Sequence, residues 1–232
     1  MKLVVFAYNF PHRKTHDFIY ELVSKGYDIQ AVIAADAVKL SIPPCEVRTK
    51  IRMRSAPHPR ETAKLFRIPY LSIPHSGSEV EQALIELSPD VGVIGGARIL
   101  KKGVIQKFKV GVLNFHPGLI PDARGLDALL WSIRDGLPLG VTAHLIDERV
   151  DAGRIIERRT IKLHPDDTVF DLTERLYGTQ IDMLTHSIDL AVRGEWEEVD
   201  YSTSSYNHKM TGELERQTLS QVAAYLDKYG TS

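Results

Sequence analysis

GVLNFHPGLIPDARGLDALLWSIRDGLPLGVTAHLIDERVDAGRII, residues 111–156, is the stretch that decides how this chain folds. It opens with the apolar run Gly111 to His116, which is typical of a buried strand, and Pro117 ends that run. From Leu126 to Asp135, apolar residues recur at the spacing of one helical face, and Gly136 follows them. Two further apolar runs come next, so the segment alternates between strand and helix as an α/β domain does.

The same alternation extends outward through the rest of the chain. Short apolar runs predict buried strands, and amphipathic runs between them predict helices. The expected strands are 3–8, 29–34, 70–73, 91–94, 111–116, 140–146 and 154–163. The expected helices are 15–25, 60–66, 78–87, 101–108, 126–135, 168–193 and 213–229. This order predicts an α/β domain with a Rossmann-like, mainly parallel sheet.

Local signals add detail to this prediction. Thr15 is expected to cap the first helix, and Ser78 with Glu81 to form a capping box on the third. Prolines at 43, 44 and 57 argue against a regular element within residues 35–58. The domain is expected to span residues 1–193, with residues 194–232 forming a C-terminal extension that carries one amphipathic helix. The apolar stripe of that helix would pack on its own domain or on a second copy in a homodimer.

Composition narrows the class of protein. The 232 residues carry a formal net charge of -1, which gives no electrostatic reason to expect a nucleic-acid partner. Cys45 is the single cysteine, so no intrachain disulfide can form, and a lone thiol fits a reducing compartment. The apolar run at the N-terminus is too short for a signal peptide, and no stretch reaches the length of a membrane span. We therefore expect a cytoplasmic protein that does not bind membranes.

Polar side chains stand at the ends of two expected strands. Asn114 and His116 alternate on one strand and so share a face, and Asp151 lies just past another strand. In parallel sheets, chemistry gathers beyond the carboxyl ends of the strands. An amide can donate to a developing oxyanion, an imidazole can move a proton, and a carboxylate can orient the imidazole. The set suits acyl transfer to an amine, although these residue types alone leave several chemistries open.

The segment resembles the signature of the folate-dependent formyltransferases. Their pattern is Asn-x-His, then Leu-x-Pro-x-x-x-Gly, then Asp-x-Gly, and the matching positions here are Asn114, His116, Leu119, Pro121, Gly125, Asp151 and Gly153. The likeness covers residues 1–193 in element order and is looser in the first half. The resemblance implies that 10-formyltetrahydrofolate is the donor, and that Asn114 and protonated His116 stabilise the oxyanion while Asp151 orients His116.

The resemblance also implies where the donor binds. The pterin ring would lie between Arg98, Ile99 and Leu100 on one side and the loop from Asp147 to Asp151, with Val150, on the other. No metal is implied, and the spacing of the chain's histidines matches no metal-ligand set. His144, on the strand leading to the site, is interpreted as a structural histidine.

The acceptor amine would approach from the loop after the first strand, where Asn9, His12 and Lys14 are expected to bind it. That loop lacks the Gly-Ser-rich phosphate cradle of the glycinamide ribonucleotide enzyme. Trp131-Ser132 resembles the sugar N-formyltransferases, although Gly118 stands where the family usually has a serine. We therefore expect a small-molecule amine as partner, and prefer an amino sugar linked to a nucleotide.

Alternatives stay open at this level. A phosphorylated purine precursor could be the acceptor, or water could replace the amine in a formyltetrahydrofolate hydrolase. The stretch after Gly194 is short for a separate domain, which disfavours a tRNA substrate. A formylfolate-binding protein would need no such set of reactive side chains. A nicotinamide-dependent dehydrogenase is disfavoured because no Gly-x-Gly-x-x-Gly follows the first strand.

Overall fold

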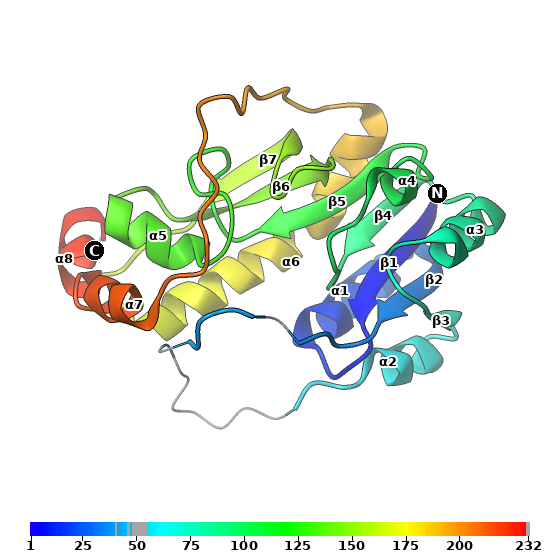
Figure 1. Cartoon of the computed structure of the whole chain (residues 1–232), viewed down its shortest axis with the longest axis horizontal. Coiled ribbons are helices and arrows are strands. Elements are labelled where there is room, and N and C mark those ends of the chain that lie inside the picture. The colour runs from blue at the N-terminus through cyan, green and yellow to red at the C-terminus, as the bar shows by residue number, and fades with distance from the viewer. Residues whose placement is uncertain (40, 46, 48–54, 231–232) are drawn as a thin grey trace.

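A seven-stranded sheet forms the centre of the molecule (Figure 1). The computed structural model describes residues 1–39, 41–45, 47 and 55–230. Its strands are β1 (Lys2–Tyr8), β2 (Asp28–Ala35), β3 (Tyr70–Ser72), β4 (Val91–Ile94), β5 (Gly111–His116), β6 (Gly140–Ile146) and β7 (Gly153–Thr160). Its helices are α1 (Arg13–Ser24), α2 (Pro59–Leu65), α3 (Ser78–Leu87), α4 (Lys102–Ile105), α5 (Ala128–Asp135), α6 (Val169–Arg193), α7 (Gly212–Leu219) and α8 (Val222–Tyr229).

The strand order is β3-β2-β1-β4-β5-β6-β7. Strands β1 to β5 pair in parallel, whereas β6 runs antiparallel to both β5 and β7. The antiparallel pairing places Asn114 of β5 opposite His144 of β6, and His116 opposite Thr142. The prediction of an α/β fold with a mainly parallel sheet is therefore confirmed, and the β5–β6 register brings His144 close to the predicted site.

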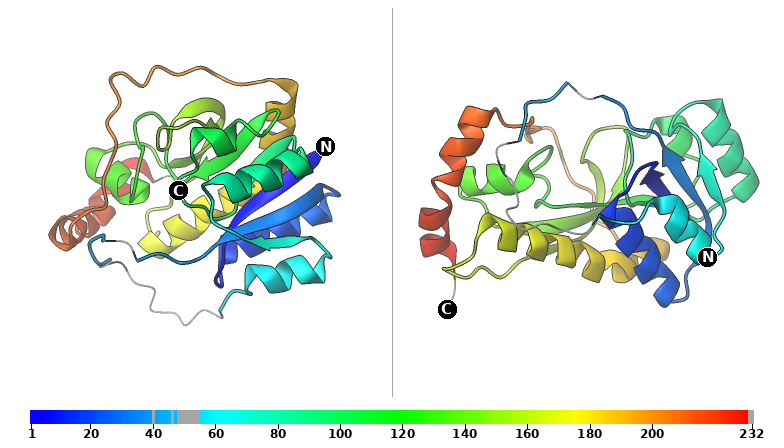
Figure 2. Two further views of the ribbon diagram at one scale, coloured as in Figure 1. Left: turned by 45° about the vertical axis from the view of Figure 1, so that its right-hand side comes forward. Right: turned by 90° about the horizontal axis from the view of Figure 1, so that it is seen from below.

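Both faces of the sheet are covered by helices, which explains why its strands are continuous apolar runs. Alternate β1 residues, such as Val5, face a core that includes Phe18 of α1 and Leu184 of α6. The residues between them, such as Phe6, face a second core that includes Leu84 of α3. The two layers of helices on opposite sides of the sheet are visible in Figure 2.

Two predicted helix caps are wrong. Helix α1 begins at Arg13, and His12 is its cap, because the His12 ring accepts from the Thr15 N–H at 3.4 Å. Helix α3 has Gly77 as its cap, with φ 104, and no side chain caps it. Ser78 is therefore the first helical residue, one position too late to cap the helix.

The extension after α6 also differs from its prediction. Residues 213–229 were expected to form one helix, but α7 ends at Leu219 and α8 starts anew at Val222. Tyr225 and Leu226 of α8 pack in a small core with residues such as Ile133 of α5. The apolar stripe is thus covered by its own chain.

The segment from 195 to 211, which we call the strap, joins α6 to α7 and is drawn in orange in Figure 1. It is held to the sheet by a bridge between Glu197 and Ile155, and to the loop after β5 by a bridge between Asn207 and Gly125. The strap therefore places part of the C-terminal extension against the loop between β5 and α5.

The region between β2 and α2 contains no helix or strand at 36–39, 41–45, 47 and 55–58, in line with its prolines. The same prediction for residues 40, 46 and 48–54 lies outside the described residues. Within the described part of the chain, no helix has both the length and the apolar character to cross a membrane.

Candidate active site

Asn114 and His116 lie on β5, and Asp151 lies in the loop from β6 to β7. The His116 Nδ1 and a carboxylate oxygen of Asp151 are 3.5 Å apart. Both side chains are largely shielded from water, with 5% and 16% of their surface exposed. The structure thus brings together residues that the sequence separates by a helix and a strand.

The second nitrogen of His116 is already committed. Its Nε2–H donates to the backbone oxygen of Ala123 at 2.7 Å, in the loop after β5. Because a neutral imidazole has one donor and one acceptor nitrogen, Nδ1 is left as an acceptor facing Asp151. If Nδ1 takes up a proton, it can donate to the carboxylate, which stabilises the imidazolium. His116 is thus arranged to take and hold a proton on the side of Asp151.

His144 supports the amide of Asn114. The Asn114 Nδ2 lies 3.2 Å from His144 Nε2, and His144 Nδ1–H donates to the Ala152 oxygen at 2.9 Å. Burial, followed by the nearby His116, lowers the pKa of His144 to about 4, so its ring is neutral near pH 7. One Asn114 N–H is therefore held by His144, and the other remains available to a ligand. Sequence reasoning treated His144 as structural, although its strand alternation was the signal that it faced the site.

The loop after β5, residues 117–127, is fixed from beneath. Thr142 Oγ1 donates to the Gly118 oxygen at 2.7 Å and accepts from the Ile120 N–H at 3.0 Å. The Gly125 N–H donates to a carboxylate oxygen of Asp151 at 3.2 Å. Sequence reasoning missed the role of Thr142, since only the pairing of β6 with β5 brings it beneath this loop.

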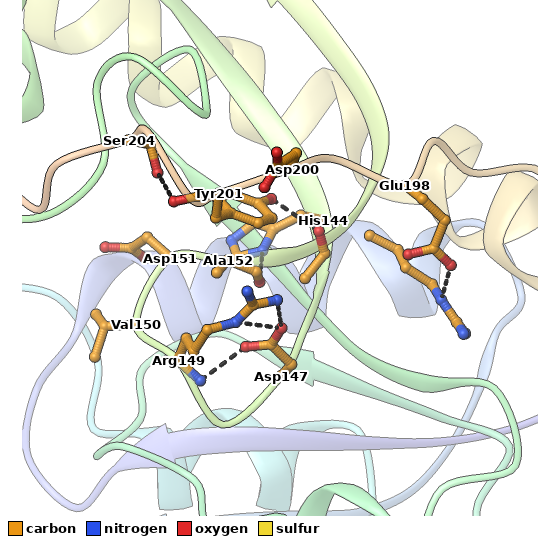
Figure 3. A network of polar contacts seen from close by, with 12 residues as sticks. His144, Asp147, Arg149, Val150, Asp151, Ala152, Glu198, Asp200, Tyr201 and Ser204 are labelled. Atoms are coloured by element: carbon orange, nitrogen blue, oxygen red, sulfur yellow. Dashed lines mark hydrogen bonds and ion pairs between the residues drawn. The ribbon is translucent and has the colours of Figure 1, made fainter.

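A cavity of about 160 Å³ opens beside these groups. It is lined by Ile94, Ala97, Arg98, Ile99, Leu100, Asn114, Ile146, Asp147, Arg149, Val150 and Asp151. The five residues predicted to hold the donor, together with Asn114 and Asp151, thus surround one space. In Figure 3, Asp147, Arg149, Val150 and Asp151 follow one another along the loop that forms one wall.

Arg98 lines this cavity, and its side chain extends toward Asp36. Its guanidinium lies over the Tyr8 ring and donates to the backbone oxygen of Asp36. Its buried Nε has no partner among the described residues. The backbone N–H of Arg98 donates to His75 Nδ1 at 3.1 Å. A buried donor without a partner is unfavourable unless a ligand or water satisfies it. Because this Nε is buried, it offers no contact to a ligand in the cavity, whose polar lining includes Asn114, Asp147 and Asp151.

A larger cavity of about 570 Å³ lies next to it and shares Ile146, Asp147 and Arg149. Its other walls come from α4, the start of β5 and the start of β7, and it touches none of Asn114, His116 or Asp151. We therefore assign the candidate site to the smaller cavity, which Asn114 and Asp151 line.

The three residues expected on the acceptor side are placed differently from one another. Lys14 Nζ donates to the backbone oxygen of Phe115, between Asn114 and His116, at 3.1 Å. Burial lowers the pKa of Lys14 to about 8, against an opposing effect of Asp151. Asn9 instead bonds to Asp36, Ser72 and Tyr70 at the ends of β2 and β3.

His12, the cap of α1, has its ring against Thr15 and Tyr8. Of the three residues, the structure thus shows only Lys14 in contact with the strand that carries Asn114 and His116. For the described residues, no group of three or more histidine, cysteine or acidic side chains is arranged to hold a metal ion.

Comparison with known proteins shows the family to which this chain belongs. The family model for formyl transferases matches residues 23–188. Methionyl-tRNA formyltransferase of Roseiflexus sp. (strain RS-1) is 37% identical over 113 residues, which are 48% of this chain and 35% of that protein. The alignments thus cover about a third of the length of the first curated relatives.

Two solved structures share the fold at low identity. An N-formyltransferase from Helicobacter canadensis, in complex with folinic acid and dTDP-3-aminofucose, gives a TM-score of 0.66 at 18% identity, over 98% of this chain and 81% of that one. Phosphoribosylglycinamide formyltransferase from Anaplasma phagocytophilum gives 0.65 at 19% identity, over 86% and 91%. The family model covers well over half of the described chain, including β5 and Asp151, and the chain therefore belongs to the formyl transferase family.

Proposed function

We propose that this protein transfers a formyl group from 10-formyltetrahydrofolate to the primary amine of a small molecule. The observation that carries the proposal is the pairing of His116 Nδ1 with Asp151, at 3.5 Å, beside a cavity that Asn114 also lines. Acyl transfer to an amine needs a donor to the developing oxyanion and a path for the amine's proton. These three side chains can supply both.

The cavity has features that fit the pterin of the donor. Apolar walls at Ile94, Leu100 and Ile146 suit a flat ring, and the polar side chains of Asn114, Asp147 and Asp151 line the same cavity. The relative from Helicobacter canadensis was solved with folinic acid, a formylated folate, which supports the same class of ligand here.

The chain's own residues would act in a simple order. The free Asn114 N–H donates to the formyl oxygen as negative charge develops there. In place of the protonated ring expected from the resemblance, His116 acts first as a base: its Nδ1 accepts the proton that the attacking amine loses, and the carboxylate of Asp151 stabilises the resulting imidazolium. The imidazolium then returns the proton to the folate nitrogen as the bond between that nitrogen and the formyl carbon breaks, which releases tetrahydrofolate. The Ala123 oxygen holds the ring orientation throughout, at 2.7 Å from Nε2.

For the acceptor, we prefer an amino sugar linked to a nucleotide. Lys14 supports an anionic acceptor, because its ammonium group reaches the backbone between Asn114 and His116. The Helicobacter canadensis relative bound dTDP-3-aminofucose, and a sugar N-formyltransferase from Shewanella sp. shares the fold with a TM-score of 0.64. A cytoplasmic location is part of the same proposal.

Two alternatives use the same site. A phosphorylated purine precursor could be the acceptor, which the fold shared with phosphoribosylglycinamide formyltransferases allows. In a hydrolase, water would take the place of the amine, and formate would leave.

The decisive experiment measures release of tetrahydrofolate from 10-formyltetrahydrofolate, with and without a panel of amines. The panel contains nucleotide-linked amino sugars, the unlinked sugars and glycinamide ribonucleotide. Release that depends on one nucleotide-linked sugar, with the formylated product seen by mass, supports the preferred acceptor. Release that needs glycinamide ribonucleotide would replace it, and release of formate without any amine would indicate a hydrolase.

A further inference from the structure

Arg124 is a buried cation whose partners are unusual. Only 8% of its surface is exposed, and it lies in the loop between β5 and α5. Its guanidinium donates to the backbone oxygens of Asp151 at 2.9 Å and Val150 at 2.8 Å, and to Ser204 Oγ at 2.7 Å. It also lies over the Tyr201 ring, 4.8 Å from the centroid. None of these partners is a carboxylate, so the side chain serves to bind backbone and strap together.

The backbone that Arg124 holds is strained. Asp151 has φ 45, in the left-handed region that residues other than glycine rarely adopt. Such a conformation costs on the order of 1 kcal/mol or more and persists only where surrounding contacts impose it. The guanidinium of Arg124 donates to the carbonyl oxygens of both Val150 and Asp151 at this turn. The next residue, Gly125, donates its N–H to the Asp151 carboxylate at 3.2 Å. Adjacent residues thus fix both the backbone and the side chain of Asp151.

The strap holds this arrangement from the other side. Asn207 donates to the Arg124 oxygen at 3.0 Å, and its own oxygen accepts from Leu126 at 2.9 Å. A Cβ on Gly125, which has φ 100, would stand only 2.2 Å from the Asn207 oxygen, so glycine permits this approach. Tyr201 donates to the Gly153 oxygen at 2.8 Å, just past the turn, and Figure 3 shows Tyr201 and Ser204 beside Asp151 and Ala152.

We infer that Arg124 is a positioning residue that holds the turn at Asp151, and that Tyr201 and Ser204 of the strap fix its guanidinium. The strap lies beyond residue 188, where the family match ends, so this support comes from a part of the chain that the family pattern does not include. Arg124 makes no hydrogen bond or ion pair with Asn114 or His116, and acts on the reaction through the turn at Val150 and Asp151. The kinetic part of this inference rests on the proposed function.

The test is chemical rescue. Arg124→Ala removes the fork, and a misplaced carboxylate should lower kcat about 10²-fold, a larger effect than the rise in the KM for the folate that follows from the lost contact with Val150. Free guanidinium, at concentrations far below those that unfold proteins, should enter the vacated space and restore part of the lost kcat. Arg124→Lys keeps the charge but loses the fork, and should remain as impaired as Arg124→Ala. Wild-type turnover in either variant, or no rescue by guanidinium, would overturn the inference.

Arg158 provides a matched control. It also ties the same loop to the strap, through the Ile120 oxygen at 2.7 Å and Glu197 at 2.6 Å, but it does not touch the turn at Asp151. Arg158→Ala should lower stability, and guanidinium should not change its kcat. Should Arg124→Ala fail to fold, Ser204→Ala removes one of the guanidinium contacts and should lower kcat by a smaller factor. If Ser204→Ala folds and its kcat is unaltered, the strap does not help to position Arg124.

A readout independent of turnover separates this inference from the proposed function. Hydrogen exchange at the amides of residues 147–152 should be faster in Arg124→Ala than in the wild type, and guanidinium should slow it again. If the wild type transfers no formyl group but this exchange pattern is found, the proposed function falls and the positioning role stands. Exchange that is equal in the two proteins would overturn the positioning role whatever the activity.

Discussion

Acidification between pH 7 and pH 5 should weaken this fold through two buried histidines. His75 donates from Nε2 to the Ile33 oxygen and accepts from the Arg98 N–H at Nδ1. His144 donates to the Ala152 oxygen and faces the Asn114 amide with its other nitrogen. In both rings the acceptor nitrogen is in use, so a second proton would break a contact inside the core. Burial lowers the pKa of each to about 4.

The sign and size of the change in unfolding free energy follow from the difference in proton binding between the unfolded and folded chains. Below pH 6.5 the unfolded chain binds a proton on each histidine while the folded chain does not until about pH 4, so stability falls as pH falls through this window. At pH 5 the difference is about 2 kcal/mol for each histidine, on the order of 4 kcal/mol together. That is a large part of the 5–15 kcal/mol or so by which domains are typically stable.

The assay is the free energy of unfolding in urea at pH 7, 6 and 5. His75→Gln and His144→Gln replace a titrating ring with an amide that does not titrate. Each variant should be less stable at pH 7, yet lose about 2 kcal/mol less than the wild type between pH 7 and pH 5. His208→Gln, at an exposed position, is the matched control and should keep the wild-type dependence. If the variant lacking both buried histidines loses as much stability as the wild type, the reasoning is refuted.

Three further outcomes follow from individual contacts. Arg175 beside Asp167 lowers the pKa of that carboxyl to about 2, so Asp167→Asn should lower the stability of the fold by about 1–2 kcal/mol near pH 7. In the wild type this contribution should fade as pH falls from 3.8 toward 2, and thermal unfolding over that range measures it. Thr142→Val leaves two buried backbone groups without a partner and should cost about 2–4 kcal/mol in urea unfolding, whereas Thr142→Ser keeps both bonds. Lys14→Met should lower kcat/KM for an anionic acceptor about tenfold. In pH–rate profiles, the wild-type kcat/KM should decline above pH 8 as Lys14 loses its proton, whereas Lys14→Arg should stay active there. A decline that persists unchanged in Lys14→Arg would assign the titration to another group.

Much of the fold could be predicted because burial on both faces leaves a clear pattern. The runs that became β1, β2, β4 and β5 are almost wholly apolar, and each is found within a residue or two of its expected limits. The caps of α1 and α3 were predicted wrongly because neighbouring residues competed for the position, and His12 and Gly77 took it. The break between α7 and α8 leaves the helical spacing of apolar residues nearly intact, so spacing could not reveal it.

The part of the candidate site that lies at the end of an apolar strand, Asn114 and His116, could be predicted from the sequence. The residues expected around the pterin also line the adjoining cavity. Asp151 meets Asn114 and His116 by another route, because β6 runs antiparallel to β5 and the loop from β6 to β7 carries Asp151 back to His116. The supports of these groups could not be predicted in the same way. Arg124 acquires its partners only when the strap folds back over the loop, and no local pattern records a contact between residues 80 positions apart.

The most direct test of the account is a single-turnover measurement with 10-formyltetrahydrofolate labelled in its formyl group. Transfer of label to the acceptor amine should occur with the wild type, and should slow at least ~10²-fold in His116→Ala and in Asp151→Asn while the folate binds about as tightly as before. A wild type that transfers label, with either variant near the same rate, would show that the His116–Asp151 pair is not the catalytic centre.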